Sequence, residues 1–492
     1  MPSLTPVGTE VLVNDLQVGN QQTADQSGSV AILSSGDQVV VYSGRGPGDT
    51  SGVFARVLDG TATPKGATFR VNTTIAGEQA EPTVVAIDAG FVVAWSGRGS
   101  GDRQGVFARR FDAAGNGLGD EMLVNTTVVG NQSQPAIAAA DDGRFVVAWC
   151  GNGPTDLEGV YLRVFAADGT ALSPQVLVNS ETRPMQTSPS IAISQDRQVL
   201  ISWSSRGQDG SGWGIYTRRF SLDAQATSAE SLVNTNTVSD QKYPAAAFGP
   251  NNDAVIAWSS RSSASDDFDI VAQRFAANRD PIGVETAIND TVSGSQIHPQ
   301  VATTPSGASL IVWTSTLQDG SGLGVFARAF DSSQVPTSEE VPVNTTSVAR
   351  QSRPAVDARS DGGFTIVWSG EGRGDHRGVF SQQFSQPQPN VAPDLLPIAN
   401  NVVTAGQLLE FSVTATDANL PDDILTFFLD PDQPQITASL VKTTATTAIF
   451  RWTPPSDLAP GDYEFTALVT DAGIPALSDA EQFTITVAAA SD

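Results

Sequence analysis

Residues 132–179, with the sequence QSQPAIAAADDGRFVVAWCGNGPTDLEGVYLRVFAADGTALSPQVLVN, decide the fold because their pattern returns along the chain. A run rich in Val and Ala ends there at Trp149, and an aromatic residue ends the equivalent run of every repeat. These aromatic residues, which lie 53 to 55 positions apart, are Tyr42, Trp95, Trp149, Trp203, Trp258, Trp313 and Trp368. A repeat of this length predicts a solenoid, a propeller or another array of equal units.

Each repeat predicts four short strands. In the quoted repeat we expect them at residues 136–140, 145–149, 159–165 and 175–179, with turn residues such as Asp142 and Gly143 between them. Four antiparallel strands per repeat are typical of a propeller blade. A solenoid needs atypical repeats as caps at both ends, and the end repeats here are not atypical. We therefore expect an all-β fold, with a seven-bladed β-propeller over residues 1–384.

The two ends of the repeat region complement each other. The last repeat stops after the run at residues 378–384 and lacks its Val-Asn strand. Residues 9–14 (TEVLVN) match the end of residues 119–125 (GDEMLVN), which is the fourth strand of another repeat. We expect residues 9–14 to complete the last blade and close the ring, because closure removes two exposed sheet edges.

The period ends before the C-terminal part of the chain. Residues 385–396 are rich in Gln, Pro and Asn and predict a linker. Residues 397–492 predict a second domain, a β-sandwich of the immunoglobulin or cadherin type. Its strands are expected at residues 409–416, 424–429, 448–452, 463–470 and 483–487.

Two short segments of this domain carry a family resemblance. Residues 415–419 (ATDAN) and 469–475 (VTDAGIP) resemble cadherin repeats and the immunoglobulin-type modules of bacterial surface proteins. The Val-Asn and Val-Val-Ala-Trp signatures of the propeller repeats resemble those of large bacterial exoproteins. The cadherin resemblance implies Ca²⁺ bound near Asp417, Asn419 and Asp471, since carboxylate and amide oxygens suit this ion. In the alternative interpretation, these side chains only hydrogen-bond a turn.

The charge balance limits the partners. Acidic residues outnumber basic ones by 53 to 27, and the formal net charge is −26. Such a surface repels nucleic acid and anionic membranes, so neither is expected as a partner. No apolar run is long enough to span a membrane. No signal peptide is visible at the N-terminus, but the exoprotein resemblance implies an extracellular or cell-surface location.

Polar side chains recur in the loops that share one face of the expected ring. They are Arg45, Arg98, Arg206 and Arg261 in the loop between the second and third strands, and Asn72, Asn125, Gln79 and Gln132 in the connection to the next repeat. A ring of equal amide and guanidinium groups would suit a lectin-like glycan binder with repeated sites. In the alternative interpretation, these side chains hold their own loops in place.

The sequence offers little that points to catalysis. The two histidines, His298 and His376, are expected to be exposed loop residues, and no nucleophile elbow, metal-binding spacing or phosphate loop is present. The similarity of the repeats also argues against one specialised pocket. We therefore expect a non-enzymatic extracellular or cell-surface protein for adhesion, binding or structural assembly. Its partners would be a cell-surface or matrix component, such as a glycan, or other copies of itself. A lectin-like binder and a propeller hydrolase or lyase remain as alternatives.

Overall fold

The computed structural model describes residues 4–489, apart from residues 18, 26–27, 183–184, 262–265, 387–389, 421–423, 431–436 and 474. Within these ranges all regular structure is β, and no helix exists that could cross a membrane. The chain divides into two compact units. The first comprises Leu4–Val335 and Glu340–Gln386, and the second is built mainly from Pro387–Asp492.

Seven antiparallel sheets make up the described part of the first unit; six are each formed by one continuous stretch of the chain, and the seventh also includes the N-terminal strand. Their strands, sheet by sheet, are β2 (Gln21–Gln22), β3 (Val30–Ile32), β4 (Gln38–Gly46), β5 (Asp49–Leu58) and β6 (Phe69–Arg70); β7 (Gln79–Ile87), β8 (Gly90–Gly99), β9 (Asp102–Phe111) and β10 (Met122–Leu123); β11 (Gln132–Ala139), β12 (Phe145–Gly151), β13 (Gly159–Phe165) and β14 (Val176–Leu177); β15 (Gln186–Ile193), β16 (Val199–Arg206), β17 (Trp213–Phe220) and β18 (Ser231–Leu232); β19 (Gln241–Phe248), β20 (Ala254–Arg261), β21 (Phe268–Phe275) and β22 (Pro281–Ala287); β23 (Gln296–Thr303), β24 (Ser309–Thr316), β25 (Leu323–Phe330) and β26 (Val341–Pro342); and β27 (Gln351–Ala358), β28 (Phe364–Gly372), β29 (Asp375–Ser385) and β1 (Thr5–Leu12).

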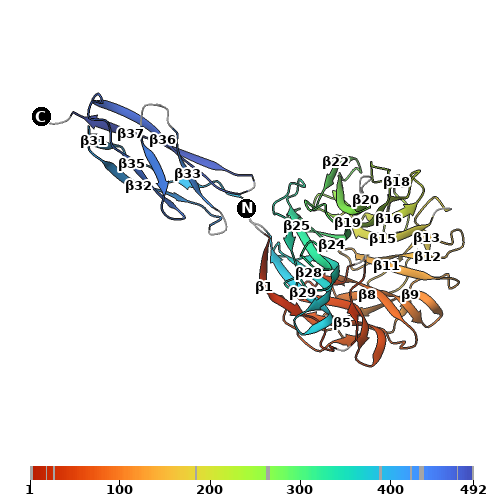
Figure 1. The fold of residues 1–492 in the computed structure, drawn as a ribbon. Helices are drawn as coiled ribbons and strands as arrows, with labels where there is room; N and C mark the ends of the chain where they lie inside the picture. Colours follow the sequence, from red (N-terminus) through yellow and green to blue (C-terminus); the bar gives the residue numbers. More distant parts are fainter. Residues whose placement is uncertain are drawn as a thin grey trace. The chain divides into compact units, whose positions relative to one another are not determined.

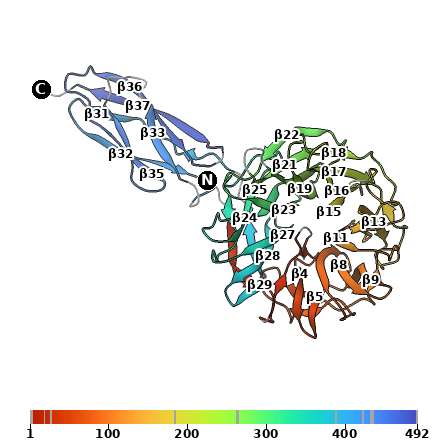
Figure 2. The same cartoon turned by 45° about the vertical axis from the view of Figure 1, so that its right-hand side comes forward.

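The first strands of these sheets form the inner wall of a ring. Each one packs against the first strand of the next sheet, in the order β3, β7, β11, β15, β19, β23, β27 and back to β3. In Figures 1 and 2 these strands lie near the centre of the ring, and strands such as β5, β9 and β13 lie toward its rim. This radial arrangement of sheets is a β-propeller.

The N-terminal strand joins the two ends of the repeat region. Strand β1 pairs antiparallel with β29, and the backbone N–H of Val13 donates to the carbonyl of Val379 at 2.8 Å. This is the pairing that the matching Val-Asn motif predicts. The sheet that closes the ring therefore combines residues about 370 positions apart in the sequence.

The repeated aromatic residue fills the space between successive sheets. Trp149 is fully buried, stacks on Tyr161 of its own sheet at 6.1 Å, and shares a core cluster with Val92 and Val106 of the preceding sheet. Burial of such a ring removes a large apolar area from water, which explains why the position recurs at the same period. The repeat signature is thus the contact that joins one sheet to the next.

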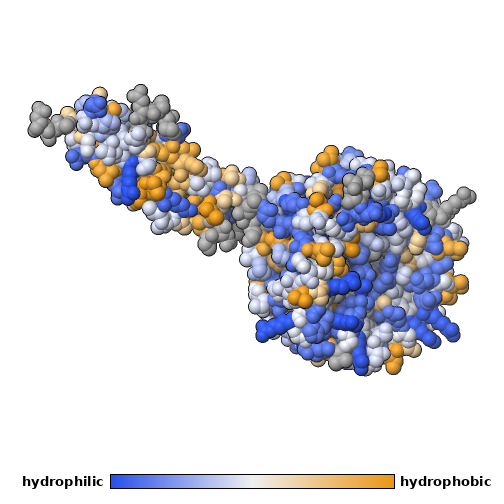
Figure 3. Space-filling model, viewed as in Figure 1, coloured by the Kyte–Doolittle hydropathy of each residue, from blue (hydrophilic) through white to orange (hydrophobic). Residues whose placement is uncertain are grey.

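The second unit consists of two four-stranded sheets over a shared aromatic core. One sheet has the order β30 (Asp394–Leu395), β32 (Leu409–Thr416), β35 (Thr447–Trp452), β34 (Ser439–Lys442), and the other β31 (Asn401–Thr404), β37 (Ser478–Ala488), β36 (Gly461–Thr470), β33 (Thr426–Asp430). Phe450, Phe465 and Phe483 contact one another between the sheets. Of the predicted features, residues 387–389 of the linker and residue 474 of the segment 469–475 lie outside the described residues. In the space-filling view of Figure 3, hydrophilic side chains predominate on the visible face of the first unit.

Candidate functional site at the inner rim of the propeller

Each inner strand carries a bulge near its beginning. In β11 the register with β12 shifts between Ser133 and Ala136, and the equivalent shift occurs in β7, β15, β19, β23 and β27. The residue at the bulge has a positive φ of 53–61° in all six strands. This conformation is costly for a residue with a side chain, and such strain tends to gather at functional sites. The sequence predicts that the repeated Gln lies in a loop and that the strand begins at residue 136. In the structure, β11 already begins at Gln132.

The residues at this bulge differ from repeat to repeat. With the equivalent residue of the first sheet they are Thr23, Glu81, Gln134, Ser188, Tyr243, His298 and Arg353. Six of them stand between a constant Gln two positions earlier and a constant Pro one position later. The repeats therefore share a scaffold but differ at this bulge position of the inner wall. Comparison of this column in the sequence would have revealed the site, whereas the overall similarity of the repeats hid it.

Tyr243 and His298 form the closest contact among these side chains. Their rings meet edge to face with centroids 4.4 Å apart, although they come from adjacent sheets. Burial lowers the pKa of His298, partly offset by the nearby carboxylate of Asp25 and reinforced by Arg353. Burial also raises the pKa of Tyr243, with Asp25 and Asp240 adding to the effect. At neutral pH the imidazole is thus uncharged and the phenol keeps its proton.

Arg353 and Asp25 complete this group on the next two sheets. The Nε of Arg353 lies 2.6 Å from Oδ1 of Asp25, and both side chains are partly exposed, at 29% and 45%. The Thr23 hydroxyl donates to the Arg353 carbonyl at 2.6 Å and so fixes the backbone beside it. We call Asp25, Tyr243, His298 and Arg353 the inner-rim cluster. All four are accessible to solvent in part, as a site for a polar ligand requires.

The side chains of other bulge residues form hydrogen bonds to neighbouring sheets. Glu81 Oε2 accepts hydrogen bonds from the Ser96 hydroxyl at 2.8 Å and from the Gln134 N–H at 2.7 Å. Gln134 Oε1 in turn accepts from the Ser188 N–H at 3.0 Å. This part of the rim is therefore a chain of contacts from sheet to sheet, while the inner-rim cluster holds the groups with acid–base chemistry.

The structure corrects the expectation for one of the two histidines. His298 is not an exposed loop residue, because it lies on β23 and is mostly buried. His376 is 90% exposed, and its Nδ1 lies 2.7 Å from the Glu371 carboxylate. His298, in the Gln-x-x-Pro segment, therefore belongs to the inner rim, whereas His376 lies at the start of β29 and lines a neighbouring cleft.

The repeated Gln residues are buried beside the repeated Trp. In two sheets the indole N–H donates to the Gln side chain: Trp149 to Gln132 at 3.3 Å and Trp258 to Gln241 at 3.1 Å. Gln79 also donates to the Arg98 carbonyl at 2.9 Å. These contacts favour the interpretation in which Gln79 and Gln132 hold the blade together.

The repeated Asn side chains likewise form their hydrogen bonds within their own sheet. Asn125 Oδ1 accepts from the Val106 N–H at 2.8 Å, and its Nδ2 donates to Asp102 Oδ2 at 2.8 Å. Asn72 makes the same contacts with Val53 and Asp49. Both side chains are 1% exposed, which leaves no surface for a ligand.

The four arginines predicted as ligand groups lie one to a sheet. Arg45, Arg98 and Arg206 are exposed, and Arg261 pairs with Asp266 at 2.7 Å. The described structure does not bring these arginines into one pocket. They remain candidates for weak surface contacts on separate sheets.

The residues proposed for Ca²⁺ in the second unit mostly support turns. Asp471 Oδ1 accepts from the Gly473 and Leu477 N–H groups, and Asn419 Oδ1 accepts from the Val391 N–H at 2.8 Å. Asp417 Oδ1 accepts from the Asn419 N–H at 2.7 Å, although its Oδ2 is buried without a hydrogen-bond partner among the described residues. Nowhere in those residues do three Asp, Glu, His or Cys groups approach one another closely enough for a metal ion. The contacts of Asp471 and Asn419 favour the alternative interpretation, in which these side chains support turns.

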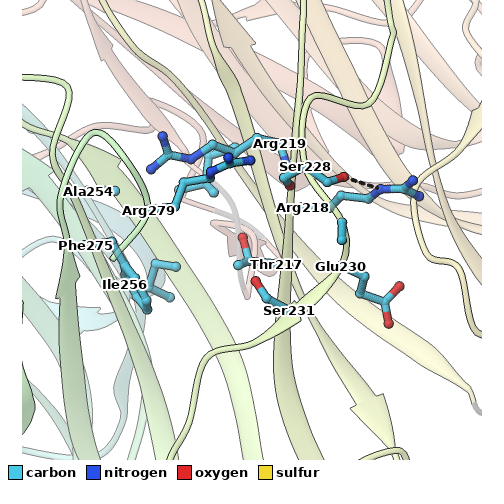
Figure 4. Close-up of a pocket in the computed structure, with 12 residues that line it drawn as sticks. Thr217, Arg218, Arg219, Ser228, Glu230, Ser231, Ala254, Ile256, Phe275 and Arg279 are labelled. Atoms are coloured by element: carbon cyan, nitrogen blue, oxygen red, sulfur yellow. Dashed lines mark hydrogen bonds between the residues drawn. The ribbon is translucent and has the colours of Figure 1, made fainter. Parts of the chain in front are cut away.

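A separate pocket of about 350 Å³ opens between the fourth and fifth sheets, and its lining contains no residue of the inner strands. Figure 4 shows its apolar floor at Ile256 and Phe275, with Arg218, Arg219 and Arg279 on its border. In the cleft between the first and second sheets, Phe69 fills the equivalent space and packs on Phe111 at 5.6 Å. Here the equivalent residue is Ser231, so the pocket is the volume that a larger side chain occupies elsewhere.

Comparison with known proteins gives structural neighbours only. No protein-family model matches this sequence, and no curated protein sequence matches it. A fungal alcohol oxidase of the AA5 family in complex with copper is 13% identical, with a TM-score of 0.48 over 98% of this chain and 100% of its own. A protein of unknown function from Dyadobacter fermentans is 10% identical, with a TM-score of 0.47 over 78% and 100%. The α-L-arabinanase of Penicillium chrysogenum in complex with arabinobiose is 13% identical, with a TM-score of 0.43 over 77% and 99%.

These neighbours contradict the prediction of a non-enzymatic protein for adhesion or assembly. They are mainly enzymes, and several are named as arabinofuranosidases, an endo-arabinase or glycoside hydrolases. The non-enzymatic prediction is therefore abandoned. Since all of the neighbours are distant, the activity proposed next is argued from the side chains of this chain.

Proposed function

We propose that this protein is a glycan-cleaving enzyme, a hydrolase or a lyase, with its site at the inner-rim cluster of a seven-bladed propeller. The observation that carries the proposal is the divergence of the bulge residues among otherwise similar repeats. Equal blades need equal residues to pack, so packing alone does not account for Tyr243, His298 and Arg353 at equivalent positions. A site for one asymmetric substrate requires unlike groups in fixed places.

The chemistry of these groups suits cleavage of a glycosidic bond. Hydrolysis needs a group that takes a proton from water, and elimination needs one that takes a proton from carbon; both need a second group that protonates the leaving oxygen. The uncharged imidazole of His298 is the candidate base, and the protonated phenol of Tyr243 is the candidate acid. Arg353 supplies a cation beside them, which Asp25 orients through their ion pair. An aromatic ring and several hydrogen-bonding groups also match the two faces of a sugar.

We also propose a role for the second unit and a location for the protein. The second unit is an immunoglobulin- or cadherin-like sandwich that carries or docks the propeller. The exoprotein resemblance supports an extracellular or cell-surface location, where the partner is a polysaccharide of the surface or matrix. Seven sheets, ring closure by β1 and the shared core of the second unit support this architecture.

A polysaccharide panel tests the activity. The full chain is incubated with neutral and acidic polysaccharides, and products are followed by new reducing ends and by the ultraviolet absorbance of unsaturated sugars, which marks elimination. Tyr243→Phe and His298→Gln are each expected to lower kcat by about 100-fold or more, as loss of a general acid or base does. Tyr463→Phe, a matched change in the second unit whose hydroxyl donates to the Ala459 carbonyl, is expected to leave kcat unchanged. Cleavage that survives both inner-rim changes, or no cleavage of any substrate, contradicts the proposal.

The pH dependence of the same reaction gives a second test. Because burial lowers the pKa of His298 from its ordinary 6.5, loss of kcat/KM through protonation of the base is expected below that pH. Because burial raises the pKa of Tyr243 from its ordinary 10.0, the alkaline loss is expected above that pH. An acid limb above pH 6.5 would show that His298 is not the base.

A further inference from the structure

A cleft beside the inner-rim cluster concentrates positive charge. The cavity has a volume of about 460 Å³ and lies between the first and last sheets of the ring, where β2 faces β27 and β28. Arg350, Arg353 and Arg377 line it, together with amides such as Gln22. We call it the basic cleft. Arg353 belongs both to this cleft and to the inner-rim cluster, so the two are continuous.

The three arginines are exceptional within the repeat. The position of Arg350, just before the constant Gln, holds Asn20, Glu78, Asn131, Met185, Asp240 and Ser295 in the other repeats. Arg377 stands two residues after an aspartate that recurs between the second and third strands, as Asp49, Asp102, Asp156, Asp209, Asp319 and Asp375. In the other repeats with this aspartate, the position of Arg377 holds Ser51, Gln104, Glu158, Ser211 and Ser321. The bulge column holds Arg only at Arg353. At all three positions, arginine thus occurs only in the last repeat, and the three arginines line one cleft. This is notable in a chain with 53 acidic and 27 basic residues.

The positive charge of the cleft is only partly compensated. Glu371 also lines it, but this carboxylate lies 2.7 Å from His376. Asp25 pairs with Arg353. Arg350 and Arg377 are exposed, and no carboxylate among the described residues lies within ion-pair distance of either guanidinium. Two planar guanidinium forks are therefore available to oxygen anions.

The equivalent cleft between β11 and β15 provides a natural comparison. It has a volume of about 740 Å³, and its described lining includes Asp156 and Glu158 but no Arg or Lys. The two clefts share their position in the repeat and the same scaffold of strand ends. Among their described lining residues, the two clefts differ in charge, so the three arginines of the basic cleft are not a consequence of the fold.

From these observations we infer that the basic cleft binds the anionic groups of an acidic polysaccharide, whose chain then runs to the inner-rim cluster. The inference rests on the proposed function and narrows its substrate to glycans with carboxylate or sulfate groups. Arg350 and Arg377 hold an anionic group in the cleft, and Arg353 contacts the sugar that is cleaved. The arginines of the basic cleft attract the anionic groups of the polymer at short range. The acidic surface that would repel the polymer is more distant, so salt screens its effect.

Binding measurements on the full chain test this inference. Calorimetry compares a polyuronate, a sulfated dextran and neutral dextran, each with the wild type and with the double variant Arg350→Gln/Arg377→Gln. We expect the wild type to prefer an acidic polymer over the neutral one and the double variant to bind it about tenfold more weakly. The affinity of the double variant should also depend less on salt. Thr182→Ala, in the comparison cleft, is the control and should leave affinity unchanged.

The outcomes separate the inference from the proposed function. Preference for the polyuronate assigns the anion as a carboxylate, and preference for sulfated dextran assigns it as a sulfate; either supports the inference. Cleavage of a neutral glycan with no preference for acidic polymers overturns the inference but leaves the proposed function intact. Unchanged affinity in a folded double variant also overturns it. Failure to cleave any polysaccharide removes the proposed function, and the inference with it.

Discussion

At the scale of single residues, the repeated amides and the varied bulge residues have opposite roles. Asn125 is fully buried and joins the Val106 backbone to the Asp102 carboxylate, so it recurs because every blade needs that contact. His298 stands in a column where no residue recurs. In this protein, repetition marks the scaffold, and divergence marks the candidate site.

Substitution of the buried amide should destabilise the ring. Asn125→Ala removes three hydrogen bonds and leaves the Val106 N–H and an Asp102 oxygen buried without partners. We expect a loss of about 2–4 kcal/mol in the free energy of unfolding, measured by urea denaturation. Asn116→Ala, in an exposed turn, is the control and should cost less than about 1 kcal/mol. Equal losses for both variants would show that the buried network contributes little.

A partly buried carboxyl at the opposite end of the inner strands gives a pH-dependent prediction. Asp357 lines a cavity of about 420 Å³ there, and burial raises its pKa to about 6. Between pH 4 and 6 the folded state holds a proton that the unfolded state has lost, so this group reduces stability as pH rises. Asp357→Asn cannot titrate, so its stability relative to the wild type should increase by about 2–3 kcal/mol from pH 4 to pH 7. Thermal unfolding across this range measures the difference, and a constant difference would contradict the raised pKa.

At the scale of elements, the contacts between neighbouring sheets come from a few regular positions. Arg163 of β13 donates through Nη1 to the Val124 carbonyl of the preceding sheet at 2.9 Å, and Arg109 reaches Val71 in the same way at 3.0 Å. In some clefts the side chain three residues before the repeated Asn fills the outer space, as Phe69 does. Ser231 is too small to do so and leaves the pocket of Figure 4.

Filling that pocket should stabilise the protein. Ser231→Met places an unbranched apolar side chain over Phe275, as Met122 does in its own cleft, and we expect a gain of about 1–2 kcal/mol in the free energy of unfolding. The reciprocal change Met122→Ser opens the filled cleft and should cost about 2–3 kcal/mol. Chemical denaturation compares the two variants. A loss of stability in Ser231→Met would show that the pocket is kept open by more than the absence of a side chain.

At the scale of the whole molecule, the ring depends on its N-terminal strand. Strand β1 pairs with β29, the Arg56 guanidinium donates to the Val13 carbonyl at 2.6 Å, and the Thr345 N–H donates to Glu10 at 2.9 Å. Residues 5–14 therefore touch both neighbouring sheets as well as their own. Deletion of residues 1–15 should lower the melting temperature by several degrees and promote self-association through the exposed edge of β29, as seen by light scattering. An unchanged, monomeric protein would contradict closure by β1.

The sequence predicts the scaffold of the propeller more readily than the candidate site. The period of Trp149 and its equivalents predicts the sheets, and residues 9–14 predict the closing strand, since both depend on contacts that every blade repeats. The inner-rim cluster depends on a bulge, a positive φ and contacts between different sheets, such as Tyr243 with His298. None of these follows from strand periodicity. The similarity of the blades also led to the wrong expectation of a non-enzymatic protein.

Binding and cleavage of a glycan at the inner rim can be tested by a crystal structure with a bound oligosaccharide. The slow variant His298→Gln would be soaked with oligosaccharides of the best substrate from the polysaccharide panel. We predict a sugar beside Tyr243 and residue 298, with Arg353 in contact with its oxygen atoms. A sugar found instead in the pocket beside Ser231 or in the cavity at Asp357, with the inner rim empty, would contradict the account.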